Sequence, residues 1–321
     1  MAKVKIQGHA SGTGVITVTA PNTSTDRVIT LPDSTDTLIG SATTDALTTR
    51  VNATGGRKNM VINGGFDVWQ RGTSTTAFSS STGYIADRFK ITSVALAGRS
   101  TDVPSSESFK YSIKIDQNTT ADPWILQGIE GMDKFIGKTV TLSYWIKPSI
   151  TTTLRDDYLK TAHGTHAISA NVWQKLTNTF VVPAGTTDGE FLYIQFPANT
   201  VATYYITGLQ LELGSVATDF EQRSYGEELA LCQRYYEQTT EVGEQFPLAK
   251  GREADRLRIS SYQYQTTKRV NPSITLLGAS GDGGPTPSAS GIGTHAFRAT
   301  CSATGDGQSP YFNGYKADAE L

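Results

Sequence analysis

Residues 204–237, YYITGLQLELGSVATDFEQRSYGEELALCQRYYE, decide the fold class of this chain. The first ten of them alternate with the period of two that is typical of a β-strand within a sheet. One face of this predicted strand holds Tyr205, Thr207, Leu209, Leu211 and Leu213, and the other holds Ile206, Gly208, Gln210 and Glu212. A strand of this length indicates a sheet with a substantial buried face.

A short helix is expected to follow that strand. Ser224 is a good N-cap, and Glu227 three residues later completes a capping box. We therefore predict a connecting helix over residues 224–237, with Cys232 buried as a small hydrophobic side chain. Its apolar face is expected to hold Leu229, Cys232 and Tyr236.

The composition excludes several classes of function. Charged residues make up 18% of the 321 residues, below the roughly 25% of ordinary globular proteins, and the formal net charge is −2. No basic patch is visible, so we expect no binding to nucleic acid. The two cysteines do not have the spacing of metal ligands, so we expect no metal and no cofactor. No apolar stretch is long enough to span a bilayer, so we expect no membrane insertion.

Turn residues and β-patterned runs divide the chain into four parts. Residues 1–56 contain short runs whose exposed edges require a partner, although an unstructured leader is the alternative. Residues 57–223 contain about eight expected strands and predict a jelly-roll β-sandwich. The helix at 224–237 then leads to residues 238–321, which are expected to form a small β-sandwich with a Gly-, Ser- and Pro-rich loop. The fold class is thus mostly β with one short helix.

Carbohydrate binding is the function that the aromatic and polar residues of the predicted β-domain favour. Aromatic faces stack on the C–H surfaces of sugars, and polar side chains around them bind hydroxyl groups. Trp124 follows a turn at the start of a predicted strand, and Trp145 alternates against the apolar face of its own strand. Trp69 and Trp173 are expected to be structural. The predicted ligand-binding residues are Trp124, Trp145, Asp156, Asp157 and Tyr158.

Catalytic patterns are scarce. The sequence has no GxSxG, HExxH or phosphate-binding loop. His163 and His166 are expected to be solvated loop residues, since no third metal ligand is suggested nearby. Asp156 and Asp157 are placed in a predicted loop, and adjacent carboxyl groups do not reveal the separation that a glycosidase needs. We therefore expect no catalytic residues and no enzyme activity.

Several strings of the sequence resemble known families. LQLELGSVATDFEQRSYGEELALCQRYYE resembles the linker and helix of phage and prophage tail-fibre proteins, and MVINGGFDVWQRGTS followed by GYIADRFK resembles the start of their central module. TVTLSYWIKPS, VWQKLTNTFVVPAGT and YYITGLQLELG resemble the jelly roll of carbohydrate-binding modules. GTGVITVTAPNTSTDRVITLPDSTDTLIG and YFNGYKADAEL are similar to N-terminal and C-terminal elements of such fibre proteins.

The resemblance implies a tail-fibre protein that attaches the phage to a host-surface glycan. It implies a homotrimer whose residues 1–56 join other tail or virion proteins, located in the virion. Since the first residues show no signal peptide, we expect synthesis in the host cytoplasm. Two alternatives stay open: a purely structural decoration or baseplate adaptor without a sugar site, and a polysaccharide depolymerase.

Overall fold

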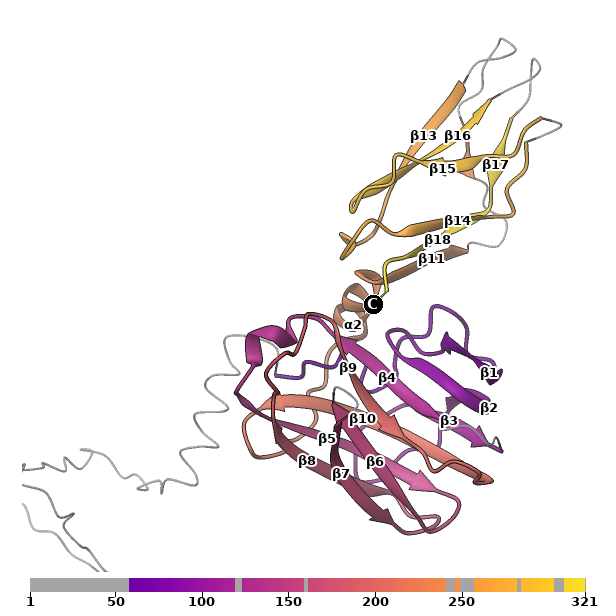
Figure 1. Ribbon diagram of the computed structural model, residues 1–321. Helices are drawn as coiled ribbons and strands as arrows, with labels where there is room; N and C mark the ends of the chain where they lie inside the picture. The colour runs from indigo at the N-terminus through magenta and orange to yellow at the C-terminus, as the bar shows by residue number, and fades with distance from the viewer. Residues whose placement is uncertain are drawn as a thin grey trace, which may run out of the picture. The chain divides into compact units, whose positions relative to one another are not determined.

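The computed structural model describes residues 58–118, 123–158, 161–240, 246–248, 257–281, 284–302 and 309–320. All of these belong to the second of two units of the chain, Ala42–Leu321. The predicted attachment segment, residues 1–56, lies outside the described residues. The described part is mostly β with one α-helix, which confirms the predicted fold class (Figure 1).

Ten antiparallel strands form one large, nearly closed sheet. The spatial order is β7-β6-β9-β4-β2-β3-β10-β5-β8, and β1 pairs with β2. A short 3-10 helix, η1, covers Met132–Phe135. The strands are β1 Thr76–Tyr84, β2 Lys90–Ser100, β3 Ser112–Gln117, β4 Trp124–Ile129, β5 Thr139–Pro148, β6 Thr152–Tyr158, β7 Thr161–Ile168, β8 Gln174–Val181, β9 Glu190–Gln195 and β10 Ala202–Leu213.

One face of β5 builds part of the core of this sheet. Its apolar side chains are fully buried, whereas Trp145 and Lys147 on the other face are partly exposed. That other face is covered in the first half of the strand, where Thr141 and Ser143 are also buried, so the alternation shows only in the second half. The buried set of β5 consists of Val140, Leu142, Tyr144 and Ile146.

The two halves of β10 bury their side chains differently. Tyr204 is buried and Tyr205 is partly exposed, whereas every residue from Ile206 to Glu212, Thr207 included, is buried. The register with β5 shifts between Thr207 and Gln210, so a bulge reverses the parity of the strand. Gly208 at its centre has φ of +68°, a left-handed conformation that favours glycine.

The stretch MVINGG lies beside β10 in the described part. The Met60 N–H donates to the Leu211 carbonyl at 2.9 Å, and the Leu209 N–H donates to the Gly64 carbonyl at 3.0 Å. The Asn59 amide group donates to the Leu209 carbonyl at 3.0 Å. These bonds satisfy the backbone of β10 beyond Ile206, where its pairing with β3 ends.

Helix α2 covers Tyr225–Gln233 and begins as predicted. The Ser224 hydroxyl accepts the Glu227 N–H at 3.3 Å, and Cys232 is completely buried. The helix is shorter than the predicted range of 224–237, because Tyr236 already belongs to the next strand. It is the sole α-helix of the described residues, and no helix there is long and apolar enough to cross a membrane.

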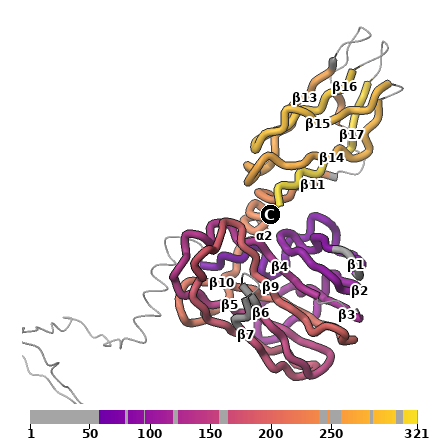
Figure 2. The backbone as a smooth tube through the Cα atoms, viewed as in Figure 1, coloured from indigo at the N-terminus to yellow at the C-terminus, as the bar shows by residue number. Residues whose placement is uncertain are grey.

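The C-terminal strands form three small sheets, β11-β18-β14, β12-β17 and β13-β16-β15. Figure 2 traces the backbone of these strands in orange and yellow. They enclose a second core built mainly from aromatic residues, among them Phe297, Phe312 and Tyr315. The predicted loop around 279–293 contains a short strand, β15. The strands are β11 Tyr236–Thr240, β12 Phe246–Pro247, β13 Leu257–Gln263, β14 Ser273–Leu277, β15 Ser288–Ser290, β16 Ala296–Ser302, β17 Tyr311–Phe312 and β18 Gly314–Asp318.

Three strands of the large sheet were not expected from the sequence: β1, β6 and β7. The β6–β7 hairpin replaces the loop that was predicted to hold Asp156 and Asp157. His166 is also not a solvated loop residue, because it belongs to β7 and its side chain is 16% exposed.

Candidate functional site

Two rows of side chains cross the outer face of neighbouring strands in the large sheet. Residues directly opposite each other in antiparallel strands project to the same face. The strand register therefore aligns one row across five strands and a second row across three. The first row is Thr92, Trp124, Gln195, Arg155 and Thr165, and the second is Lys90, Leu126 and Tyr193.

Aromatic rings form the centre of this outer face. The Trp124 and Tyr193 ring centroids are 5.2 Å apart, with the planes at 75°. Phe191 continues the series, with its ring 5.9 Å from that of Tyr193. Burial, together with the charge of Glu190, raises the pKa of Tyr193, so its phenol remains a neutral hydrogen-bond donor and acceptor. The result is an aromatic platform, defined here as Trp124, Tyr193 and Phe191.

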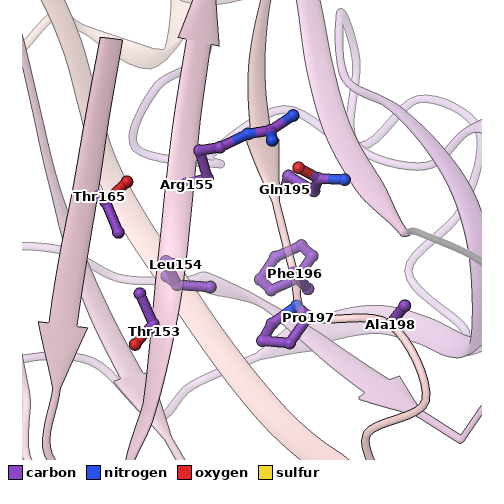
Figure 3. A pocket seen from close by; sticks show the side chains of 8 residues that line it. All are labelled: Thr153, Leu154, Arg155, Thr165, Gln195, Phe196, Pro197 and Ala198. Atoms are coloured by element: carbon purple, nitrogen blue, oxygen red, sulfur yellow. The ribbon is translucent and has the colours of Figure 1, made fainter. Parts of the chain in front are cut away.

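A hollow of about 400 Å³ lies beside the platform, because its lining includes Gln195 and Arg155 of the first row. Figure 3 shows the lining side chains, with Arg155 extending toward the side of Gln195. The Arg155 guanidinium carbon is 5.7 Å from the centroid of the Trp124 ring. Gln195 pairs in register with both Trp124 and Arg155. The hollow is lined by Thr153, Leu154, Arg155, Thr165, Gln195, Phe196, Pro197 and Ala198.

This arrangement combines flat apolar surface with groups that donate and accept hydrogen bonds. The aromatic rings offer surface to the C–H groups of a sugar. Arg155, Gln195 and Thr165 supply donors and acceptors at the edge of that surface, as polar groups do in small-molecule sites. The chemistry fits a sugar-containing ligand that lies across the strands.

The structure separates the predicted site residues. Trp124 belongs to the first row, whereas Trp145 lies on another part of the sheet, paired with Thr207 of β10 and Lys175 of β8. Asp157 and Tyr158 are at the end of β6, where Asp157 pairs in register with Tyr193. Their side chains are outside the described part.

Asp156 is directed into the interior and is 1% exposed. One carboxylate oxygen accepts from the Asn178 amide at 2.7 Å, and the other is 2.9 Å from the His166 Nε2. The Tyr144 hydroxyl donates to Asp156 at 3.4 Å, and burial, followed by the Asp156 charge, raises the pKa of Tyr144 well above its ordinary value. Side chains of the protein thus contact both carboxylate oxygens of Asp156. The buried cluster of Asp156, Asn178, His166 and Tyr144 is not part of the lining of the hollow.

The two tryptophans expected to be structural are held by hydrogen bonds. Trp69 is 8% exposed and donates its indole N–H to the Phe66 carbonyl at 2.5 Å. Trp173 is half-buried and donates to the Asp102 carboxylate at 3.1 Å. No group of three or more His, Cys, Asp or Glu side chains that could hold a metal ion occurs in the described part of the chain.

Sequence reasoning missed most of the platform. Tyr193 and Gln195 alternate with buried Leu192 and Ile194, a pattern that predicts an outer face for β9. That pattern does not reveal that β4 and β6 flank β9. The pairing of strands distant in sequence is what brings Tyr193 beside Trp124.

Comparison with known proteins gives partial similarities to solved structures. A domain of bacteriophage CBA120 tailspike protein 4 is 21% identical, covers 48% of this chain and has a TM-score of 0.33; the match spans only 21% of that domain. A family 22 carbohydrate-binding module of Clostridium thermocellum Xyn10B is 14% identical over 41% of this chain and 89% of its own length, with a TM-score of 0.34. No family model and no curated protein matches the sequence.

A protein from Bacteroides thetaiotaomicron described as a sugar-binding protein is also similar. It is 11% identical and covers 49% of this chain and all of its own length, with a TM-score of 0.33. At these identities and scores the similarities concern parts of the backbone alone, so the argument for function rests on the side chains described above.

Proposed function

We propose that this chain is a phage tail-fibre protein that attaches the virion to a host-surface glycan through the aromatic platform and the hollow beside it. The observation that carries the proposal is the alignment of Trp124 with Gln195 and Arg155 in one cross-strand row. The tail-fibre part of the proposal is supported by the sequence strings quoted above.

The proposed action is binding without catalysis. Asp156, one of the two carboxylates considered for a depolymerase, is enclosed by its own protein partners and is not part of the lining of the hollow. We further propose that three chains assemble and that residues 1–56 join them to neighbouring virion proteins. Several weakly binding sites carried on one particle raise the overall affinity without new contacts at any one of them.

Glycan-array binding of the full-length chain tests the proposed site. We expect Trp124→Ala to weaken binding about tenfold, since aromatic stacking contributes roughly 0.5–1.5 kcal/mol beyond the burial of its area. Trp145→Ala is the matched control, because it removes the same ring from a partly exposed position on β5. We expect this control to bind as the wild type does.

The outcomes separate the alternatives. A loss of binding with Trp145→Ala and not with Trp124→Ala would move the site to the β5 surface. Failure of the wild-type chain to bind any glycan or any susceptible host cell would favour a purely structural virion protein.

A further inference from the structure

A second hollow, of about 360 Å³, lies away from the aromatic platform. Its volume falls within the roughly 300–1,000 Å³ range of small-molecule sites. Three separate parts of the chain form it: the segment before β1, the end of β2 with the start of β3, and the first residue of α2. Its lining residues are Asp67, Trp69, Gln70, Thr73, Arg99, Lys110, Tyr111 and Tyr225.

The charges around this hollow favour an anion. Arg99 and Lys110 supply two positive charges, and Asp67 is the one acidic residue of the lining. Burial raises the pKa of Asp67, while the charge of Lys110 opposes that effect. Neither cation forms an ion pair within 4 Å with an acidic side chain of the described residues, although the charge of Lys110 is partly balanced by Asp67. The two positive charges outnumber the one negative charge of the lining.

Arg99 is held beside an aromatic ring. The Arg99 guanidinium carbon lies 4.4 Å from the centroid of the Tyr111 ring, which orients the planar group and leaves its N–H groups for a ligand. Tyr225, the first residue of α2, is 58% exposed, although it is a large aromatic side chain. An exposed tyrosine at the mouth of a hollow is positioned to cover a bound ring.

We propose that this hollow is a second binding site, specific for a sugar residue that carries a carboxylate. The guanidinium of Arg99 and the ammonium of Lys110 bind the carboxylate, and Tyr111 and Tyr225 contact the sugar ring. Asp67 and Thr73 accept or donate hydrogen bonds at hydroxyl groups. This assignment does not depend on the platform at Trp124, which shares no residue with the hollow.

The shape and the mixture of groups favour a saccharide over an acidic peptide. A peptide carboxylate would use the two cations but would leave the aromatic walls and the hydroxyl-binding groups without a partner. A sugar acid uses all three kinds of group in one compact ligand.

Ligand-observed NMR on the full-length chain tests the site, with galacturonate as the probe and galactose as the neutral comparison. We expect galacturonate to bind at least tenfold more tightly than galactose, and its affinity to fall as salt is raised. Arg99→Gln and Lys110→Gln should each weaken galacturonate binding about tenfold, the effect of one lost charge-assisted contact. Asp67→Asn should strengthen it, because a negative charge beside the ligand is removed.

Two controls make the test specific. Lys134→Gln removes an exposed positive charge that is not part of the lining and should change nothing. Trp124→Ala should leave galacturonate binding intact, so failure of the platform and failure of this site are distinguishable. Equal affinity for galacturonate and galactose, no detectable binding of either, or displacement of galacturonate by a short glutamate peptide of higher affinity would overturn the proposal.

Discussion

Gly64 shows how tightly the first described segment packs on β10. A Cβ atom added at this position would lie 2.0 Å from the Leu209 carbonyl oxygen, a backbone atom that cannot move aside. The Leu209 N–H in turn donates to the Gly64 carbonyl, so the contact is part of a hydrogen-bonded pair of segments. Any side chain here must separate the two segments.

We therefore expect Gly64→Ala to lower the free energy of unfolding by about 3 kcal/mol, as overpacking of a close contact does. Urea denaturation followed by tryptophan fluorescence measures this value. Gly226→Ala is the matched control, because an added Cβ meets nothing within 4 Å there and alanine favours the helix. A Gly64→Ala variant as stable as Gly226→Ala would contradict the close packing.

At the scale of elements, the sequence predicts strands well where apolar residues alternate with polar ones. On β5, the apolar face against which Trp145 alternates is buried, and Trp145 itself is partly exposed, as expected. β6 and β7 were missed because TTLRDDY and TAHGTHAI contain few apolar residues. They pair as strands because their partners supply the hydrogen bonds and the inner surface, which local sequence does not show.

The same limit applies to the candidate site. Trp124 was predicted as a groove residue from its position at a strand start, and it lies in the first row. Asp156 was assigned to a loop and is buried instead, since a hairpin turns its side chain inward. The sequence contains the alternation, but the bulge at Gly208 and the order of the strands arise from contacts between distant segments.

The buried cluster on the β6–β7 hairpin gives a test at this scale. Asp156→Ala would leave Asn178, His166 and Tyr144 without their common acceptor, so we expect a loss of about 3 kcal/mol in the free energy of unfolding. Thermal and urea denaturation measure it. Asp133→Ala, at an exposed position in η1, should change stability by less than about 0.5 kcal/mol.

Asp156→Asn separates this structural role from the depolymerase alternative. The amide keeps the size of the side chain, so the variant can be assayed as a folded protein. If the wild-type chain released reducing ends from host polysaccharide and folded Asp156→Asn did not, Asp156 would have a catalytic role. We expect neither protein to release them.

At the scale of the whole molecule, the described residues form two cores within one unit of the chain, Ala42–Leu321. Members of the first core extend from Val61 to Leu211, and those of the second from Leu248 to Ala317. Glu320 forms ion pairs with Arg88 and Arg71, and the Arg88 guanidinium carbon lies 3.5 Å from the Tyr235 ring centroid. These contacts join residues distant in sequence inside one folding unit.

We therefore expect deletion of residues 1–50 to leave the described residues folded, with a melting temperature within a few degrees of that of the full chain. If the short β-patterned runs in that segment pair between copies, the same deletion removes the trimer. Light scattering should then give three times the 34.5 kDa chain mass for the full-length protein and a smaller assembly for the shortened one. A full-length monomer at micromolar concentration would contradict the proposed assembly, whereas a shortened chain without cooperative unfolding would show that the core requires the deleted residues.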